Sequence, residues 1–112
     1  MSRSGSKPKE APASPPENPV GTAALVVPLR NAVGLHARPA VKLTQLAARF
    51  AATIELRVGE EGDWVDAKSI VRVMGLKART GTVLQLRAVG ADAAEALGNI
   101  EKLVLGDFEQ TS

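Results

Sequence analysis

Apolar residues follow a strand-like pattern in four segments of the chain. Residues 23–29 form a run rich in Val and Leu, which is typical of a strand. Pro28 cannot donate a ladder hydrogen bond, so we expect this strand at a sheet edge. Strict alternation over residues 53–58 and 82–89 predicts two half-buried strands. A short strand that begins at Trp64, after a polar turn, would complete a hairpin with residues 53–58.

Helical spacing of apolar residues predicts three helices between these strands. The first contains Pro39 in its first turn, where the missing N–H costs nothing. Its apolar positions recur at i, i+3, i+4 and i+7: Leu43, Leu46, Ala47 and Phe50. Ser69 is the expected N-cap of a short helix over residues 70–76. Asp92 is expected to cap the last helix, which Gly106 ends.

The element order βαββαβα and the length of 112 residues predict one α+β domain, which we place at residues 21–112. Residues 1–20 are rich in Ser, Pro, Lys and Glu, and we predict that they form a disordered N-terminal tail. A solvated extension explains this composition more simply than a binding motif does. The chain lacks an apolar signal peptide or membrane-spanning segment, so we expect a cytoplasmic protein without membrane association.

Composition argues against several kinds of site. With no Cys and a single His, we expect no thiolate chemistry, no Cys- or His-rich metal site and no cofactor. The 14 Lys and Arg residues against 12 Asp and Glu leave a net charge of only +2. Aromatic residues are limited to Phe50, Trp64 and Phe108, which provide no stacking platform. We therefore expect no nucleic-acid binding.

His36 stands in the segment Gly-Leu-His-Ala-Arg-Pro of residues 34–39, between a turn and a helix start. The first N–H groups of a helix lack internal partners, so those of Ala37 and Arg38 are expected to bind an anion beside the His36 ring. Arg38 adds planar donors suited to phosphate oxygens, and neutral imidazole is nucleophilic near pH 7. Taken alone, His36 would be a helix cap or a surface residue. Its neighbours favour a phosphoryl-accepting histidine instead, because each has a role in one phosphate site.

Residues 34–40 resemble the active-site motif of HPr, the histidine-containing phosphocarrier of the bacterial phosphoenolpyruvate-dependent phosphotransferase system. Residues 66–76 resemble the family's regulatory-serine helix, and residues 81–84 resemble its last strand. The resemblance implies an open-faced β-sandwich, in which three helices cover one face of a four-stranded antiparallel sheet. It also implies that His36 accepts phosphate on Nδ1 from phosphorylated enzyme I and passes it to enzyme IIA-type acceptors. Such a protein is a phosphoryl-transfer intermediate rather than a stand-alone catalyst.

The resemblance also implies roles for the helix that follows Ser69. Ser69 would be phosphorylated by an HPr kinase/phosphorylase, which is compatible with its capping role. Exposed apolar residues of this helix would form a docking patch near the histidine. Val71 and Met74 are our candidates, with core packing as the alternative for each. The basic residues expected to surround the patch and steer acidic partners are Arg72, Lys68, Lys42 and Arg49.

Some positions resemble the nitrogen-regulatory branch of the family, NPr, notably Asn31 and residues 43–47. Val33 stands where sugar-transport members carry a polar residue that caps the first helix, and Arg72 replaces a common glycine. Two functions therefore stay open: a phosphocarrier, or an HPr-like regulatory interaction module without a major role in sugar uptake. The presence of both His36 and Arg38 favours the carrier, and we expect it to be a monomer.

Overall fold

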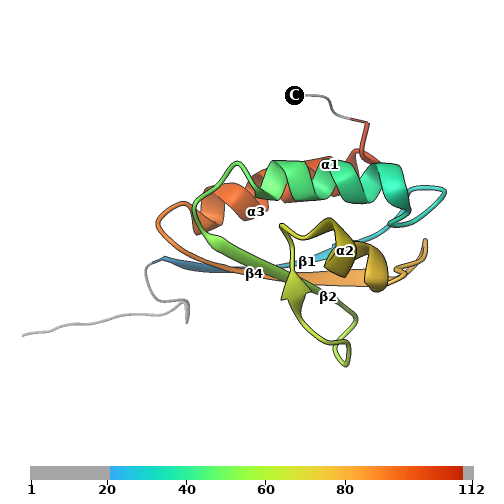
Figure 1. Ribbon diagram of the computed structural model, residues 1–112, viewed down its shortest axis with the longest axis horizontal. Helices are drawn as coiled ribbons and strands as arrows, with labels where there is room; N and C mark the ends of the chain where they lie inside the picture. The colour runs from blue at the N-terminus through green and yellow to red at the C-terminus, as the bar shows by residue number, and fades with distance from the viewer. Residues whose placement is uncertain (1–20, 110–112) are drawn as a thin grey trace, which may run out of the picture.

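The computed structural model describes residues 21–109. One layer is a four-stranded antiparallel sheet in the order β1-β4-β2-β3, formed by β1 (Thr22–Pro28), β2 (Thr53–Val58), β3 (Val65–Asp66) and β4 (Val83–Val89). The other layer contains α1 (Ala37–Ala47), α2 (Ile70–Gly75) and α3 (Ala93–Leu105), all on the same side of the sheet (Figure 1). This arrangement is an α+β open-faced sandwich and confirms the predicted fold. The predicted tail of residues 1–20 lies outside the described residues.

The alternation of side chains in the central strands separates a covered face of the sheet from an open one. The covered face of β2 and β4 contributes five buried residues to the core: Ile54, Leu56, Leu84, Leu86 and Ala88. On the open face, the Arg57 and Arg87 guanidinium groups stack on the Trp64 ring, 4.5 and 4.0 Å from its centroid. These contacts stabilise the hairpin that carries the two-residue strand β3.

β1 lies at an edge of the sheet, as Pro28 predicted. In the antiparallel register, Pro28 at the end of β1 pairs with Val83 at the start of β4. The chain after Pro28 and the chain before Val83 therefore run side by side, and a backbone hydrogen bond of 2.9 Å extends the contact beyond this pair. As a result, residues 29–36 lie against residues 76–82.

Two helix ends differ from the sequence-based expectation. α1 ends at Ala47, so Phe50 is not on its apolar face but lies half-buried in the connection to β2. Asp92 occupies the N-cap position of α3, but its carboxylate makes no cap. It accepts hydrogen bonds from the backbone N–H groups of Ala51 and Ala52, each at 2.9 Å. The bond from Ala51 is the main reason why the pKa of Asp92 lies below its ordinary value.

None of the helices formed by residues 21–109 has the length and apolar character needed to cross a bilayer.

Candidate functional site

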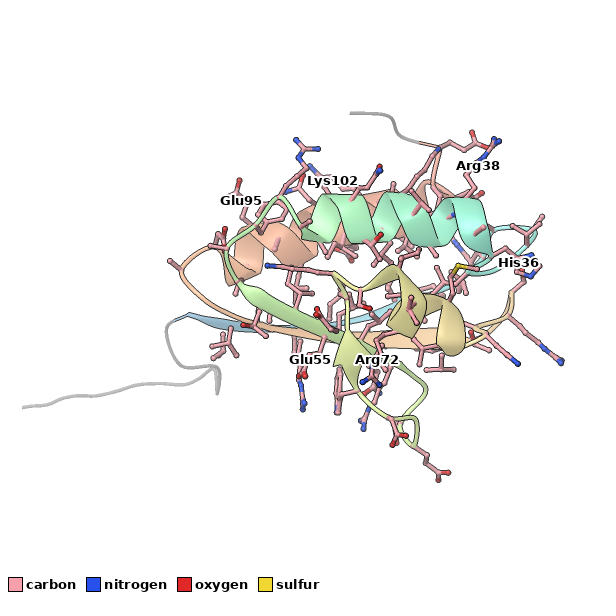
Figure 2. The ribbon with its side chains drawn as sticks, in the orientation of Figure 1. His36, Arg38, Glu55, Arg72, Glu95 and Lys102 are labelled. Atoms are coloured by element: carbon pink, nitrogen blue, oxygen red, sulfur yellow. The ribbon has the colours of Figure 1, made fainter. Side chains whose placement is uncertain are left out.

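His36 directly precedes α1 and is exposed at one end of the molecule (Figure 2). Its backbone is extended, with φ −75° and ψ −172°, and its carbonyl accepts the first helical hydrogen bond, from the Ala40 N–H at 2.9 Å. The imidazole makes no capping hydrogen bond to the helix. The ring is therefore available to a partner molecule.

The first turn of α1 presents backbone donors next to this ring. The N–H groups of Ala37 and Arg38 have no acceptor among residues 21–109, and Pro39 has no N–H to satisfy. The first turn contains no acidic residue. Together with the positive end of the helix dipole, these two N–H groups favour an anion beside His36.

Gly34 allows the loop before His36 to pack against the loop before β4. Its φ is +68°, and a Cβ at this position would lie 2.5 Å from the carbonyl oxygen of Ala78. The next residue, Leu35, donates its N–H to the same carbonyl at 3.0 Å. A side chain at position 34 would therefore break the contact that holds His36 in place.

Asn31 supports this loop from inside. It is 5% exposed, its Nδ2 donates to the Gly34 carbonyl at 2.9 Å, and its own carbonyl accepts a hydrogen bond from the Thr80 hydroxyl. Val33 is 50% exposed, and α1 begins without a side-chain cap. The N–H groups of the first turn therefore have no side-chain acceptor among residues 21–109.

An open hollow of about 530 Å³ lies beside His36. The residues that line it are Leu35, His36, Ala37, Met74, Lys77, Ala78 and Arg79. Arg38 does not line the hollow, and Figure 2 shows its side chain pointing away from the His36 ring. Two other basic residues, Lys77 and Arg79, line the hollow together with His36, and neither was predicted from the sequence as part of the site. The sequence shows that both residues come just before the last predicted strand. It does not show the pairing of β1 with β4 that brings their loop to the residues before His36.

α2 forms the next part of this surface. Ser69 caps it as predicted, because its hydroxyl oxygen accepts the Arg72 N–H at 3.3 Å. Val71 is 77% exposed and Met74 40%, whereas Val73 is fully buried. The structure therefore gives Val73 the packing role and leaves Val71 and Met74 on the surface, where Arg72 is exposed as well.

Two of the basic residues predicted around the docking patch donate to backbone carbonyls. The ammonium group of Lys42 donates to the Phe108 carbonyl at 2.6 Å, and that of Lys68 donates to the Phe50 carbonyl at 2.7 Å. Phe50 lies beyond the C-terminal end of α1, whose 11 residues span about 16 Å. Lys68 is therefore at the opposite end of α1 from His36.

The site combines a nucleophilic ring with donors for an anion. Among residues 21–109, no three His, Asp or Glu side chains gather in a way that could hold a metal ion. Within the described part of the chain, the residues that line the hollow also include no carboxylate that could serve as a general base. This chemistry suits the transfer of a negatively charged group to and from the ring.

Comparison with known proteins agrees with this geometry. The family model for the PTS HPr component phosphorylation site matches residues 25–105. The chain belongs to the HPr family. Members of this family are phosphocarriers that interact with enzymes of the phosphotransferase system.

HPr-family relatives are found in both branches that the sequence suggested. Phosphocarrier protein HPr of Cupriavidus necator is 41% identical over 78 residues, which cover 70% of this chain and 85% of the relative. Phosphocarrier protein NPr of Proteus mirabilis is 34% identical over 84 residues, which cover 75% of this chain and 92% of the relative. The crystal structure of HPr-C-His from Thermoanaerobacter tengcongensis superposes with a TM-score of 0.73 at 32% identity, covering 80% of this chain and 99% of that one.

Proposed function

We propose that the protein accepts a phosphoryl group on His36 from phosphorylated enzyme I and passes it to enzyme IIA-type acceptors of the phosphoenolpyruvate-dependent phosphotransferase system. The observation that carries this proposal is the exposed His36 ring beside two unpaired N–H groups of α1, in a chain of the HPr family. The described residues that line the hollow include no carboxylate to act as a general base, and the partners complete the chemistry. The protein acts as a cytoplasmic phosphoryl-transfer intermediate rather than as a stand-alone catalyst.

In the proposed transfer, Nδ1 of the neutral His36 ring attacks the phosphorus atom of the donor. A phosphorus–nitrogen bond forms to His36 while the bond between phosphorus and the donor breaks, and its electron pair stays on the donor. The Nε2 proton remains on the ring, whose positive charge makes it a good leaving group in the next transfer. The N–H groups of Ala37 and Arg38 hold phosphoryl oxygens during both steps. The Arg38 guanidinium reaches them after its side chain turns toward the ring.

Partner docking is the proposed role of the surface beside His36. Val71 and Met74 are apolar and exposed, which suits contact with an apolar partner surface. Arg72 adds an exposed positive charge on the same helix. Lys42 and Lys68 contribute long-range attraction for acidic partners, and less direct contact, because their ammonium groups already donate to carbonyls.

Ser69 is the proposed target of an HPr kinase/phosphorylase. A phosphate at this N-cap would leave the helix folded and add negative charge to the docking surface. Incubation with a cognate kinase and ATP should modify the wild-type protein and leave Ser69→Ala unmodified. Equal modification of both proteins would exclude Ser69 as the target.

Incubation with enzyme I and phosphoenolpyruvate tests the carrier function directly. We expect one phosphoryl group per chain that is labile in acid and stable in base, because the chain has a single His. His36→Ala should take up none. Glu95→Gln is a suitable control, because Glu95 lies at the far end of the molecule from His36 (Figure 2) and should not affect uptake. The carrier proposal fails if wild type stays unlabelled or if His36→Ala is labelled as well.

A regulatory interaction module is the second candidate, which the NPr relative favours. Phosphorylated protein offered to sugar-type and nitrogen-type IIA acceptors distinguishes the two. Rapid transfer to a sugar-type acceptor supports a role in sugar uptake. Transfer to a nitrogen-type acceptor alone, or to none, supports the regulatory function.

A further inference from the structure

Lys77 and Arg79 lie on the loop before β4 and line the hollow beside His36. They flank Ala78, which is 4% exposed and whose carbonyl accepts the Leu35 N–H at 3.0 Å. Ala78 is buried, whereas Lys77 and Arg79 on either side of it are exposed. The backbone contact to Leu35 holds this loop against the residues before His36, so that Lys77 and Arg79 line the same hollow as the histidine.

The charges of Lys77 and Arg79 are not used elsewhere in the described part of the chain. Neither side chain forms an ion pair or a side-chain hydrogen bond with another residue of 21–109. By contrast, Lys42 and Lys68 donate to backbone carbonyls. Lys77 and Arg79 are therefore available to an anion that enters the hollow.

The backbone of Lys77 adds a second observation. Its φ is +53°, in the left-handed region, and it directly follows Leu76, the C-cap of α2. Glycine is preferred at this position because a Cβ destabilises the conformation. A long cationic side chain at a position that favours glycine, beside an open hollow, suggests a function for that side chain.

A phosphoryl group on His36 needs more positive charge than α1 provides. Such a group carries roughly −1.5 to −2 charges at pH 7, whereas a helix N-terminus supplies about +0.5. The Arg38 side chain is directed away from the ring in Figure 2 and adds one positive charge only after it turns toward the phosphoryl group. Lys77 and Arg79 together bring two positive charges to the hollow.

We propose that Lys77 and Arg79 bind the oxygens of the phosphoryl group carried by His36. The Arg79 guanidinium offers planar paired donors, and the Lys77 ammonium group offers a compact charge. This inference rests on the proposed function of His36 and assigns two phosphate-binding residues to it.

Phosphorylation rates of four variants test the assignment: Lys77→Gly, Arg79→Met, the double variant and Lys102→Met. Two donors are used: phosphorylated enzyme I, and phosphoramidate, a small donor that needs no docking surface. Each single substitution should slow phosphorylation by about fivefold with both donors, and the double substitution by about 25-fold. Lys102→Met is the matched control, because Figure 2 shows Lys102 on α3 away from His36, and its rates should equal those of wild type.

Lys77→Gly separates function from folding. Because glycine suits the left-handed conformation, this variant should melt at the same temperature as wild type or higher while it accepts phosphate more slowly. In a ³¹P NMR titration of the phosphorylated proteins, the midpoint of the phosphoryl signal should move to higher pH in Lys77→Gly and Arg79→Met. Loss of a nearby cation disfavours the more highly charged phosphate.

Unchanged rates and midpoints in the double variant would overturn the assignment. Slower reaction with enzyme I alone would also overturn it, because the two side chains would then bind the partner and not the phosphate. Failure of wild type to react with enzyme I would count against the carrier function instead. In that case, phosphoramidate labelling and the titration would still decide whether Lys77 and Arg79 bind the phosphoryl group.

Discussion

Gly34 is the residue on which the position of His36 depends most directly. In Gly34→Ala, the added methyl group would lie 2.5 Å from the Ala78 carbonyl oxygen, and the φ of +68° would disfavour any side chain. We expect a loss of about 2–4 kcal/mol in the free energy of unfolding, since both strain and overpacking act at this position. Urea denaturation followed by circular dichroism measures this loss.

Gly98→Ala is the matched control for this prediction. Gly98 lies within α3, and a Cβ there would meet nothing within 4 Å. Alanine is the better helix former, so we expect this variant to gain about 0.5–1 kcal/mol. Similar effects of the two substitutions would show that the contact between Gly34 and Ala78 does not matter for stability.

At the scale of elements, Asp92 connects the start of α3 to the segment between α1 and β2. Its carboxylate accepts two backbone hydrogen bonds, which lower its pKa below the ordinary 3.8, chiefly through the bond from Ala51. An acid with a lowered folded-state pKa stabilises the fold above its ordinary pKa and loses that effect as the pH falls through the lowered value. Asp92→Asn should therefore reduce the unfolding free energy at pH 7 and have a smaller effect near pH 2.

Thermal denaturation between pH 2 and 7 tests the role of Asp92. Asp63→Asn removes a carboxylate from the exposed turn between β2 and β3, where no described residue pairs with it, and should have little effect at any pH. A difference between Asp92→Asn and wild type that stays constant over the whole pH range would contradict the proposed linkage.

At the scale of the whole molecule, one core lies between the sheet and the three helices. The buried residues of the described part run from Val27 to Phe108. Deletion of residues 1–20 should therefore leave the unfolding midpoint and the phosphorylation of His36 unchanged. We also expect the full chain of 11.7 kDa to sediment as a monomer at micromolar concentration.

Circular dichroism checks the unfolding midpoint, incubation with enzyme I and phosphoenolpyruvate checks phosphorylation, and sedimentation velocity checks the monomer. The matched comparison is the full chain measured under the same conditions. A lower midpoint after deletion would mean that the tail packs on the domain. A sedimenting species of twice the mass would show that the protein is a dimer and contradict the expected monomer.

Local patterns of apolar residues predicted most of the helices and strands, because alternation and helical spacing indicate which side of each element is buried. They were less reliable where a residue's partner is distant in the sequence. Phe50 continues the helical spacing of α1 but follows the end of that helix. Asp92 stands in a cap position, yet its carboxylate bonds to residues 51 and 52. Nothing near either residue in the sequence indicates these placements.

The sequence by itself was enough to select His36 as the candidate site residue and to predict the start of the helix that follows it. The reason is that Gly34, His36 and Pro39 act through the backbone of a few consecutive residues. Only the tertiary structure decided which basic residues line the hollow at His36. Arg38 is two residues away in the chain but points away from His36, whereas Lys77 and Arg79 are about 40 residues away and line the same hollow. The physical reason is the antiparallel pairing of β1 with β4, which joins two loops that no local pattern connects.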